Sequence, residues 1–219
     1  MKPPTSRSPR SIAGISLRSI PGAVAAILVG CASMMGSNVP SDAEVAMLLK
    51  QSFVERGQAK LERLDQSALQ RACSTYVNGD LPKELRAQLE QAALAGVKYP
   101  ADPRWTGDWR EGEKVAQSGR GMQFSDPADA PGGGNCYACH QLSKQELAFG
   151  NIGPSLYNYG KLRGVNDATL KYTWAKIWNS HSFNACSQMP RYGDAGILSE
   201  TQLKDLMALL LDPASPVNR

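Results

Sequence analysis

The sequence lacks several features that would place it in a specialised class of protein. It has no low-complexity tract, no internal repeat and no apolar run of the roughly 20 residues that a helix needs to cross a bilayer. Of its 219 residues, 42% are hydrophobic and 20% are charged, which is a globular composition. The length and composition predict one ordinary domain with an additional segment, and they argue against two large domains.

Acidic residues are missing from the first thirty positions, which contain four cations, Lys2, Arg7, Arg10 and Arg18. This basic start, followed by the short apolar run 23–30 and small residues, is the plan of a secretory signal peptide. Removing those four cations from the 24 Lys and Arg leaves 20, against 20 Asp and Glu. Because cleavage would leave a neutral mature chain, the charge gives no support for nucleic-acid binding.

The end of this segment also contains a candidate lipidation site. Leu28-Val29-Gly30-Cys31 resembles the bacterial lipobox, in which the cysteine is lipidated and becomes the new N-terminus. Ordinary cleavage just downstream, near Ala32-Ser33, is the alternative. We predict that residues 1–31 are a signal peptide, that the protein is periplasmic, and that it contacts the membrane only through a lipid on Cys31, if at all.

The five cysteines carry much of the chemical information: Cys31, Cys73, Cys136, Cys139 and Cys186. Cys136 and Cys139 stand with His140 in the pattern C-x-x-C-H, which attaches haem c through two thioether bonds and gives the iron a histidine ligand. A structural zinc site would usually show a second Cys or His pair at ligand spacing, and the sequence has none. A thioredoxin-like redox pair would lie near a βαβ pattern, and this segment lacks alternating strands. We therefore predict one covalent haem c.

The haem iron needs a sixth ligand or an open site, and the downstream candidates are His181, Met189 and Met207. Met207 lies at helical spacing on an apolar face, so core packing explains it better than ligation. Met189 lies in an irregular loop directly before Pro190. We predict that His140 and Met189 are the axial ligands, with His181 as the alternative. A histidine–methionine pair raises the reduction potential and suits electron transfer.

Other residues are expected around the haem. A metal-bound imidazole donates its second N–H to a fixed acceptor, and Pro154 in Gly153-Pro154-Ser155-Leu156 offers its carbonyl for this role. The exposed haem edge is expected near three polar residues that would serve the propionates, Tyr159, Arg163 and Arg191. The alternative is that these three residues only solvate a loop.

Cys73 and Cys186 remain once the haem and signal cysteines are assigned. Export would place them in an oxidising compartment, where free thiols do not persist, so the two are predicted to form a disulfide. This bond would tie the N-terminal helical region to the loop that contains Met189.

Apolar spacing predicts helices throughout and no sheet. The expected helical ranges are 42–75, 84–95, 109–118 and 169–178, together with a closing helix after the capping box Ser199 to Gln202. The order of C-x-x-C-H after a first helix, a Gly-Pro-x-Leu loop and a late Met-Pro before a closing helix resembles the plan of class I cytochromes c. From this resemblance we predict an all-α protein with a class I cytochrome c domain at 105–219 and a helical extension with a linker at 32–104. The helices at Trp109 and Ser199 are expected to cross, with Gly112 allowing a close approach.

Four separated motifs then show a closer resemblance: Gly134-Asn135-Cys136-Tyr137-Ala138-Cys139-His140, Gly150-Asn151-Ile152-Gly153-Pro154-Ser155-Leu156, Lys176-Ile177-Trp178-Asn179 and Cys186-Ser187-Gln188-Met189-Pro190-Arg191-Tyr192-Gly193. In this order they resemble the SoxX family of monohaem sulfur-oxidation cytochromes. The ending 209–218 is also similar to that family, and the resemblance covers about residues 105–218.

The resemblance implies a partner cytochrome, SoxA, with which the chain would form a heterodimer. That pair couples thiosulfate oxidatively to a cysteine of the carrier protein SoxYZ. The resemblance places the sulfur chemistry of this L-cysteine S-thiosulfotransferase on SoxA, so this chain would hold no catalytic residue. It would receive electrons and pass them to a downstream electron acceptor. The alternatives are an independent periplasmic monohaem electron shuttle and a haem with an open iron site.

Overall fold

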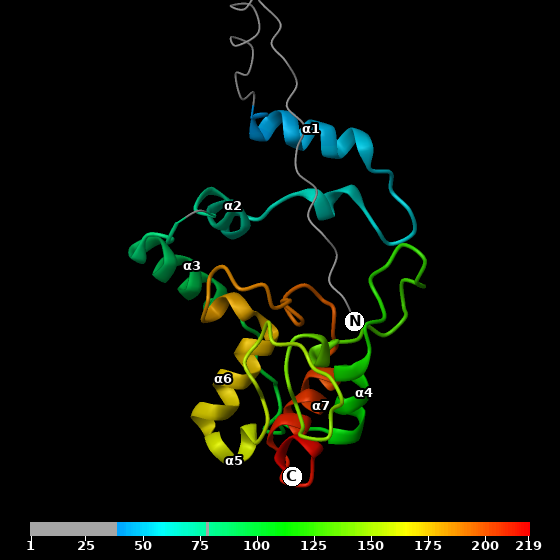
Figure 1. Ribbon diagram of the computed structural model, residues 1–219, viewed down its shortest axis with the longest axis vertical. Coiled ribbons are helices and arrows are strands. Elements are labelled where there is room, and N and C mark those ends of the chain that lie inside the picture. Colours follow the sequence, from blue (N-terminus) through cyan, green and yellow to red (C-terminus); the bar gives the residue numbers. More distant parts are fainter. Residues whose placement is uncertain (1–38, 78) are drawn as a thin grey trace, which may run out of the picture. The chain divides into compact units, whose positions relative to one another are not determined.

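The chain is all-α over the residues that the computed structural model describes, 39–77 and 79–219 (Figure 1). No β-strand occurs in these ranges, where the only extended pairing is an isolated bridge between Arg56 and Ala59. The predicted signal peptide and Cys31 lie outside the described residues. Ala43–Arg219 forms one compact unit, and of the other unit, Met1–Asp42, only residues 39–42 are described. None of the described helices is long and apolar enough to cross a membrane.

The extension begins with three short helical segments rather than one continuous helix over 42–75. They are α1 (Asp42–Ser52), the 3-10 turn η1 (Leu61–Leu64) and α2 (Ala68–Thr75). Gly57, with φ of 51°, reverses the chain between α1 and η1, a conformation that L side chains rarely adopt. The Ser67 side chain accepts a hydrogen bond from Gln70 N–H, and the Gln70 side chain caps Ser67 in return. This capping box starts a new helix, so the continuous prediction is wrong at its centre.

A third helix of the extension, α3 (Lys83–Ala95), starts directly after Pro82, close to its predicted range. It packs against the 3-10 turn η3 (Ser180–Ser182). The linker that follows α3 is also attached to the rest of the chain, because the indole N–H of Trp174 donates to the Lys98 carbonyl at 2.9 Å.

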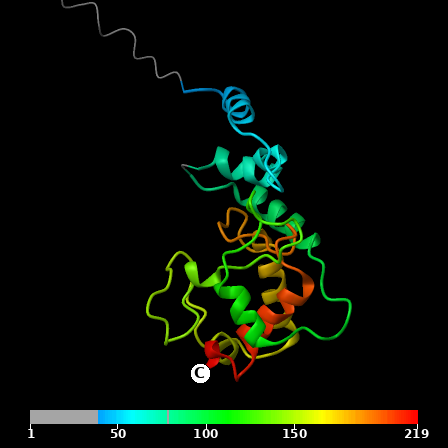
Figure 2. The same cartoon turned by 90° about the vertical axis from the view of Figure 1, so that its right-hand side faces the viewer.

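Two helices form the most extensive contact between elements, α4 (Trp109–Gln117) and α7 (Glu200–Leu211), and they lie side by side in both views (Figures 1 and 2). A Cβ atom at Gly112 would lie 2.6 Å from the Asp205 carbonyl carbon and 3.1 Å from Leu206 N. The structure therefore confirms the predicted close approach at Gly112. It also confirms the capping box between Ser199 and Gln202 at the start of α7.

The remaining elements complete the core around α7. Helix α6 (Asp167–Trp178) begins two residues before its predicted start, because the Asn166 side chain caps it by accepting from Thr169 N–H at 3.0 Å. Helix α5 (Tyr159–Arg163) is a short helix outside the predicted helical ranges. The 3-10 turns η2 (Cys136–Ala138) and η4 (Pro216–Asn218) are also short. The buried core is formed mainly by α7, α6 and flanking residues: Ala116, Leu142, Trp174, Ile177, Tyr192, Leu198, Leu203, Leu206, Met207, Leu209, Leu210, Leu211 and Val217.

Candidate functional site

The C-x-x-C-H segment forms one tight turn that starts at η2. Its backbone is closed by hydrogen bonds from Cys139 N–H and His140 N–H to the Cys136 carbonyl, at 3.1 and 2.9 Å. Asn135, with φ of 46°, turns the chain into this segment in the left-handed region, where asparagine is among the better tolerated residues. Cys136 and Cys139 are both free thiols. The turn thus presents two thiols and one imidazole within five residues.

The imidazole of His140 is held by the Gly-Pro loop. Its Nδ1 lies 2.7 Å from the Pro154 carbonyl oxygen, the acceptor that the sequence pairs with it. Since a carbonyl can only accept, Nδ1 is the donor in this bond, and in the neutral ring Nε2 then has a free lone pair. Gly153 approaches the ring so closely that a Cβ atom there would lie 2.5 Å from Nδ1 and 2.6 Å from Nε2. This loop therefore fixes both the tautomer and the plane of the ring.

An apolar cavity of about 40 Å³ lies beside the turn. Two of its walls are the side chains of His140 and Met189. The rest of the lining is Cys136, Leu142, Leu156, Ile177, Tyr192, Leu206, Leu209 and Leu210. The cavity therefore combines one thiol, one imidazole and one thioether with a hydrocarbon surface.

Met189 is positioned by hydrogen bonds to its backbone. Its carbonyl accepts from the Ser180 hydroxyl at 2.6 Å, and its N–H donates to Ser187 Oγ at 3.2 Å. The other candidate ligands do not line this cavity. His181 is buried and its Nε2 bonds to the Ser187 carbonyl at 3.2 Å, while Met207 is completely buried in the core.

The electrostatics of the cavity oppose a reactive-thiol site. Burial raises the pKa of the Cys136 thiol to about 12, whereas reactive and zinc-binding cysteines need the thiolate. Burial also raises the pKa of Tyr192, the nearby Cys136 and Cys139 sulfurs adding to the shift, so its phenol stays protonated. The Tyr192 hydroxyl donates to the Gly134 carbonyl, which ties the Met189 side of the cavity to the C-x-x-C-H turn.

Trp178 adds a feature that the sequence did not single out as part of a site. Its indole Nε1 is buried and has no hydrogen-bond partner among the described residues. The ring lies against Gly193, where a Cβ atom would come within 3.0 Å of Trp178 Cγ. The residues that precede Trp178 and Gly193 in the chain, Ile177 and Tyr192, both line the cavity. An orphan buried donor costs about 1–3 kcal/mol unless an acceptor satisfies it. Trp178 does not itself line the cavity, but a propionate of haem c would be an acceptor of the right kind for this donor. The cavity residues fit haem c in their thiol, imidazole, thioether and apolar side chains.

The three polar residues predicted at the haem edge do not line the cavity. The Tyr159 hydroxyl lies 2.8 Å from the Thr173 hydroxyl, and the Arg163 guanidinium lies over the Tyr159 ring, 5.4 Å from its centroid. Arg191 forms an ion pair with Asp194 at 2.9 Å and is the neighbour of the cavity residue Tyr192. The structure thus gives Tyr159 and Arg163 contacts with each other, and only Arg191 a place next to the lining.

Cys73 and Cys186, the two remaining described cysteines, are joined in a disulfide with a Cα–Cα distance of 5.6 Å. The bond links residues 113 positions apart and fastens α2 to the loop that contains Met189. The same loop is also tied to α3, because the Ala185 N–H donates to the Glu90 carboxylate at 3.1 Å.

Comparison with known proteins gives one informative relative. No family model matches the chain. An uncharacterized lipoprotein from Aquifex aeolicus strain VF5 is 37% identical over 180 residues, which cover 81% of this chain and 84% of the lipoprotein.

Proposed function

The chain belongs to the same family as the Aquifex aeolicus lipoprotein, and we propose that it is a monohaem cytochrome c of the class I type. One haem c would be attached through Cys136 and Cys139. The observation that carries this proposal is the His140 ring, whose Nδ1–H donates to Pro154 at 2.7 Å and whose Nε2 is left free beside a cavity that Met189 also lines. This is the arrangement that a histidine-ligated iron needs.

The chain's own residues would each have a distinct task. The Pro154 carbonyl orients His140 and would increase the basicity of the ring. Ser180 and Ser187 hold the backbone of Met189, whose side-chain sulfur would be the second ligand of the iron. The leucines and Ile177 exclude water, and Trp178 N–H would donate to a propionate. When bound, the haem iron supplies one-electron transfer. With both axial positions occupied, it would have no vacant position for a substrate.

The packing of the helices supports the class I topology. The crossing of α4 and α7 at Gly112 lies on one side of the turn, and α7 contributes Leu206, Leu209 and Leu210 to the cavity wall. The C-x-x-C-H turn, the Gly-Pro loop and the Met189 loop each contribute residues to the cavity lining, which a class I cytochrome c would need.

We further infer that this cytochrome is the electron-accepting subunit of a SoxAX-type heterodimer, as the resemblance of its four motifs to SoxX implies. Coupling thiosulfate to a carrier cysteine releases two electrons, and one haem iron accepts only one at a time. Among the described cysteines, two would be bound to haem and two are joined as a disulfide, so none is left as a sulfur nucleophile. The partner SoxA would therefore hold the reactive sulfur, and this chain would accept its electrons.

The cellular location of the chain is a further part of the proposal. The relative's name, a lipoprotein, agrees with the lipobox-like Leu28-Val29-Gly30-Cys31 of this sequence. We propose export to the periplasm, with a lipid on Cys31 as the only membrane attachment.

The haem assignment is tested by mass spectrometry of the exported protein. A digest should contain the peptide 136–140 with one haem added covalently, and Cys136→Ala with Cys139→Ala should abolish the addition. A peptide with two unmodified thiols in the exported protein would contradict the assignment.

The heterodimer is tested separately, by purification of the native protein from the periplasm and by assay with a thiol carrier. A permanent cytochrome partner should co-purify, and the chain alone should not couple thiosulfate to the carrier. Purification without a partner would favour the independent electron shuttle instead.

A further inference from the structure

A second cavity, of about 330 Å³, lies at the Cys73–Cys186 disulfide and shares no lining residue with the candidate haem site. Both sulfur-bearing residues are in its wall. The other lining residues come from the end of α2, the segment before α3, α3 itself and the Met189 loop: Tyr76, Val77, Gly79, Asp80, Leu81, Arg86, Asn184, Ala185 and Gln188. A structural disulfide is usually sealed in a core, and this one borders a cavity that solvent can enter.

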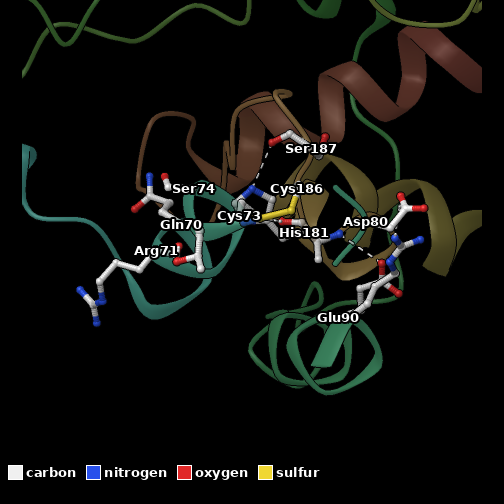
Figure 3. Close-up of a disulfide and its surroundings, with 12 residues drawn as sticks. Gln70, Arg71, Cys73, Ser74, Asp80, Glu90, His181, Cys186 and Ser187 are labelled. Atoms are coloured by element: carbon white, nitrogen blue, oxygen red, sulfur yellow. Dashed lines mark hydrogen bonds and ion pairs between the residues drawn. A yellow bond between two sulfur atoms is a disulfide. The ribbon is translucent and has the colours of Figure 1, made fainter. Parts of the chain in front are cut away.

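The two cysteines differ in their exposure. Cys186 is exposed and Cys73 is only half-buried, so a small molecule in the cavity can reach the bond from the Cys186 side. Figure 3 shows the bond between α2 and the Met189 loop, with the side chains of both segments around it. Thiol–disulfide exchange requires this access, because the attacking thiolate must approach one sulfur directly.

The cavity also contains a permanent positive charge, the guanidinium of Arg86. Its ion pair with Asp80 is long, at 3.8 Å, and the Asp80 side chain is fully exposed, at 103%. Exposed pairs of this kind contribute little and leave the cation available to a second anion. A thiolate that enters the cavity would therefore meet a cation on α3 and an accessible disulfide together.

We propose that this cavity is a thiol–disulfide exchange site for a small thiolate. The thiolate attacks Cys186 Sγ and forms a new sulfur–sulfur bond, while the Cys73–Cys186 bond breaks. Cys73 leaves with the electron pair as a thiolate and takes a proton from water. The incoming thiol sulfur is oxidised to the level of a disulfide while the Cys73 sulfur is reduced to a thiolate, so the step needs no other oxidant or reductant. Arg86 stabilises the negative charge of the reacting sulfurs.

The contacts around the loop determine what the exchange releases. The loop would remain attached through Ala185 N–H to Glu90 and through the Ser180 hydroxyl to the Met189 carbonyl. Helix α2 would lose its covalent link to the Met189 loop. Exchange therefore acts on the tether between the extension and the loop, three residues before Met189.

The test uses the purified haem-loaded full-length protein and 2-mercaptoethanesulfonate as the thiol, with iodoacetamide added at early times. Peptide mass spectrometry should find the thiol on Cys186 and the alkyl group on Cys73. Arg86→Gln should slow the reaction about two- to fivefold, the size expected from an exposed charge interaction, and Arg86→Lys should restore most of the rate. Arg71→Gln is the matched control, since Arg71 lies on α2 near the bond but does not line the cavity (Figure 3).

Three results would overturn the proposal. The first is a disulfide that reacts only after denaturation, and the second is the reverse placement of the thiol on Cys73. The third is an Arg86→Gln rate equal to that of the unaltered protein, or a loss in Arg71→Gln of the same size.

Discussion

The replacement of Gly153 by alanine is the most direct test of the His140 geometry. The new Cβ would lie 2.5 Å from His140 Nδ1 and 2.6 Å from Nε2, about 1 Å inside normal contact distance. The loop cannot easily move away, because Gly153 N–H donates to the Cys139 carbonyl at 2.8 Å. The ring must therefore shift by about 1 Å, which exceeds the roughly 0.5 Å within which a site must hold its ligands.

Two measurements follow from this displacement. Overpacking of this kind costs about 1–3 kcal/mol, which chemical denaturation of the oxidised protein would detect. The covalent haem should remain on Cys136 and Cys139, while the absorption spectrum should change as the His140 bond to the iron weakens. Gly96→Ala is a matched control, since a Cβ there meets its nearest atom, the Ala93 carbonyl oxygen, at an ordinary 3.5 Å. A Gly153→Ala protein with an unaltered spectrum and stability would refute the proposed role of this loop.

Three further predictions use other parts of the structure. Met189→Ala should abolish the near-infrared methionine–iron band of the oxidised protein, whereas Met47→Ala on α1 should keep it; persistence in the first variant would reject Met189 as ligand. The double substitution Cys73→Ser with Cys186→Ser should lower the free energy of unfolding by up to about 4–5 kcal/mol on the chain-entropy model for a 113-residue separation, and it should increase amide exchange in α2. Unchanged stability would contradict the idea that the disulfide stabilises the protein by constraining the unfolded state. Burial raises the pKa of Asp205, so its contribution to stability is present below its ordinary value of 3.8 and is lost as the pH rises through the folded-state value. Asp205→Asn should therefore gain melting temperature relative to the unaltered protein at pH 7 and little at pH 3, and an equal gain at both would contradict the pKa shift.

The features that the sequence predicts best depend on residues close together in the chain. The capping box at Ser199 and Gln202 needs only a four-residue window, and α7 begins where that window places it. The same motif at Ser67 and Gln70 also starts a helix, but the apolar residues keep their helical spacing across it, so the spacing predicts one continuous helix there. Gly57, which lies between α1 and η1, is the sign of a break that the sequence does contain, because glycine readily adopts the positive φ that the structure shows there.

Features set by packing could not be predicted in this way. From the sequence, Trp178 is expected only to be an aromatic residue on a helix. The folded structure shows that its Nε1 is buried without an acceptor among the described residues. Tyr192 likewise lines the cavity because its hydroxyl reaches the Gly134 carbonyl 58 residues away. Tyr159 and Arg163 carry the right groups for a propionate, yet packing directs them to Thr173 and to each other.

The two sides of the cavity differ in how far along the chain their supporting residues lie, and this difference indicates a role for the helical extension. His140 is held by Cys139, Gly153 and Pro154, all within 14 residues of it. The Met189 loop instead depends on the extension, through the disulfide to α2 and the bond from Ala185 to α3. Because thioether sulfur is a weaker ligand than imidazole, the methionine side is the one that benefits from outside support. In the proposed haem site the extension would therefore support the weaker of the two iron ligands, while the stronger one would be held by its own loop.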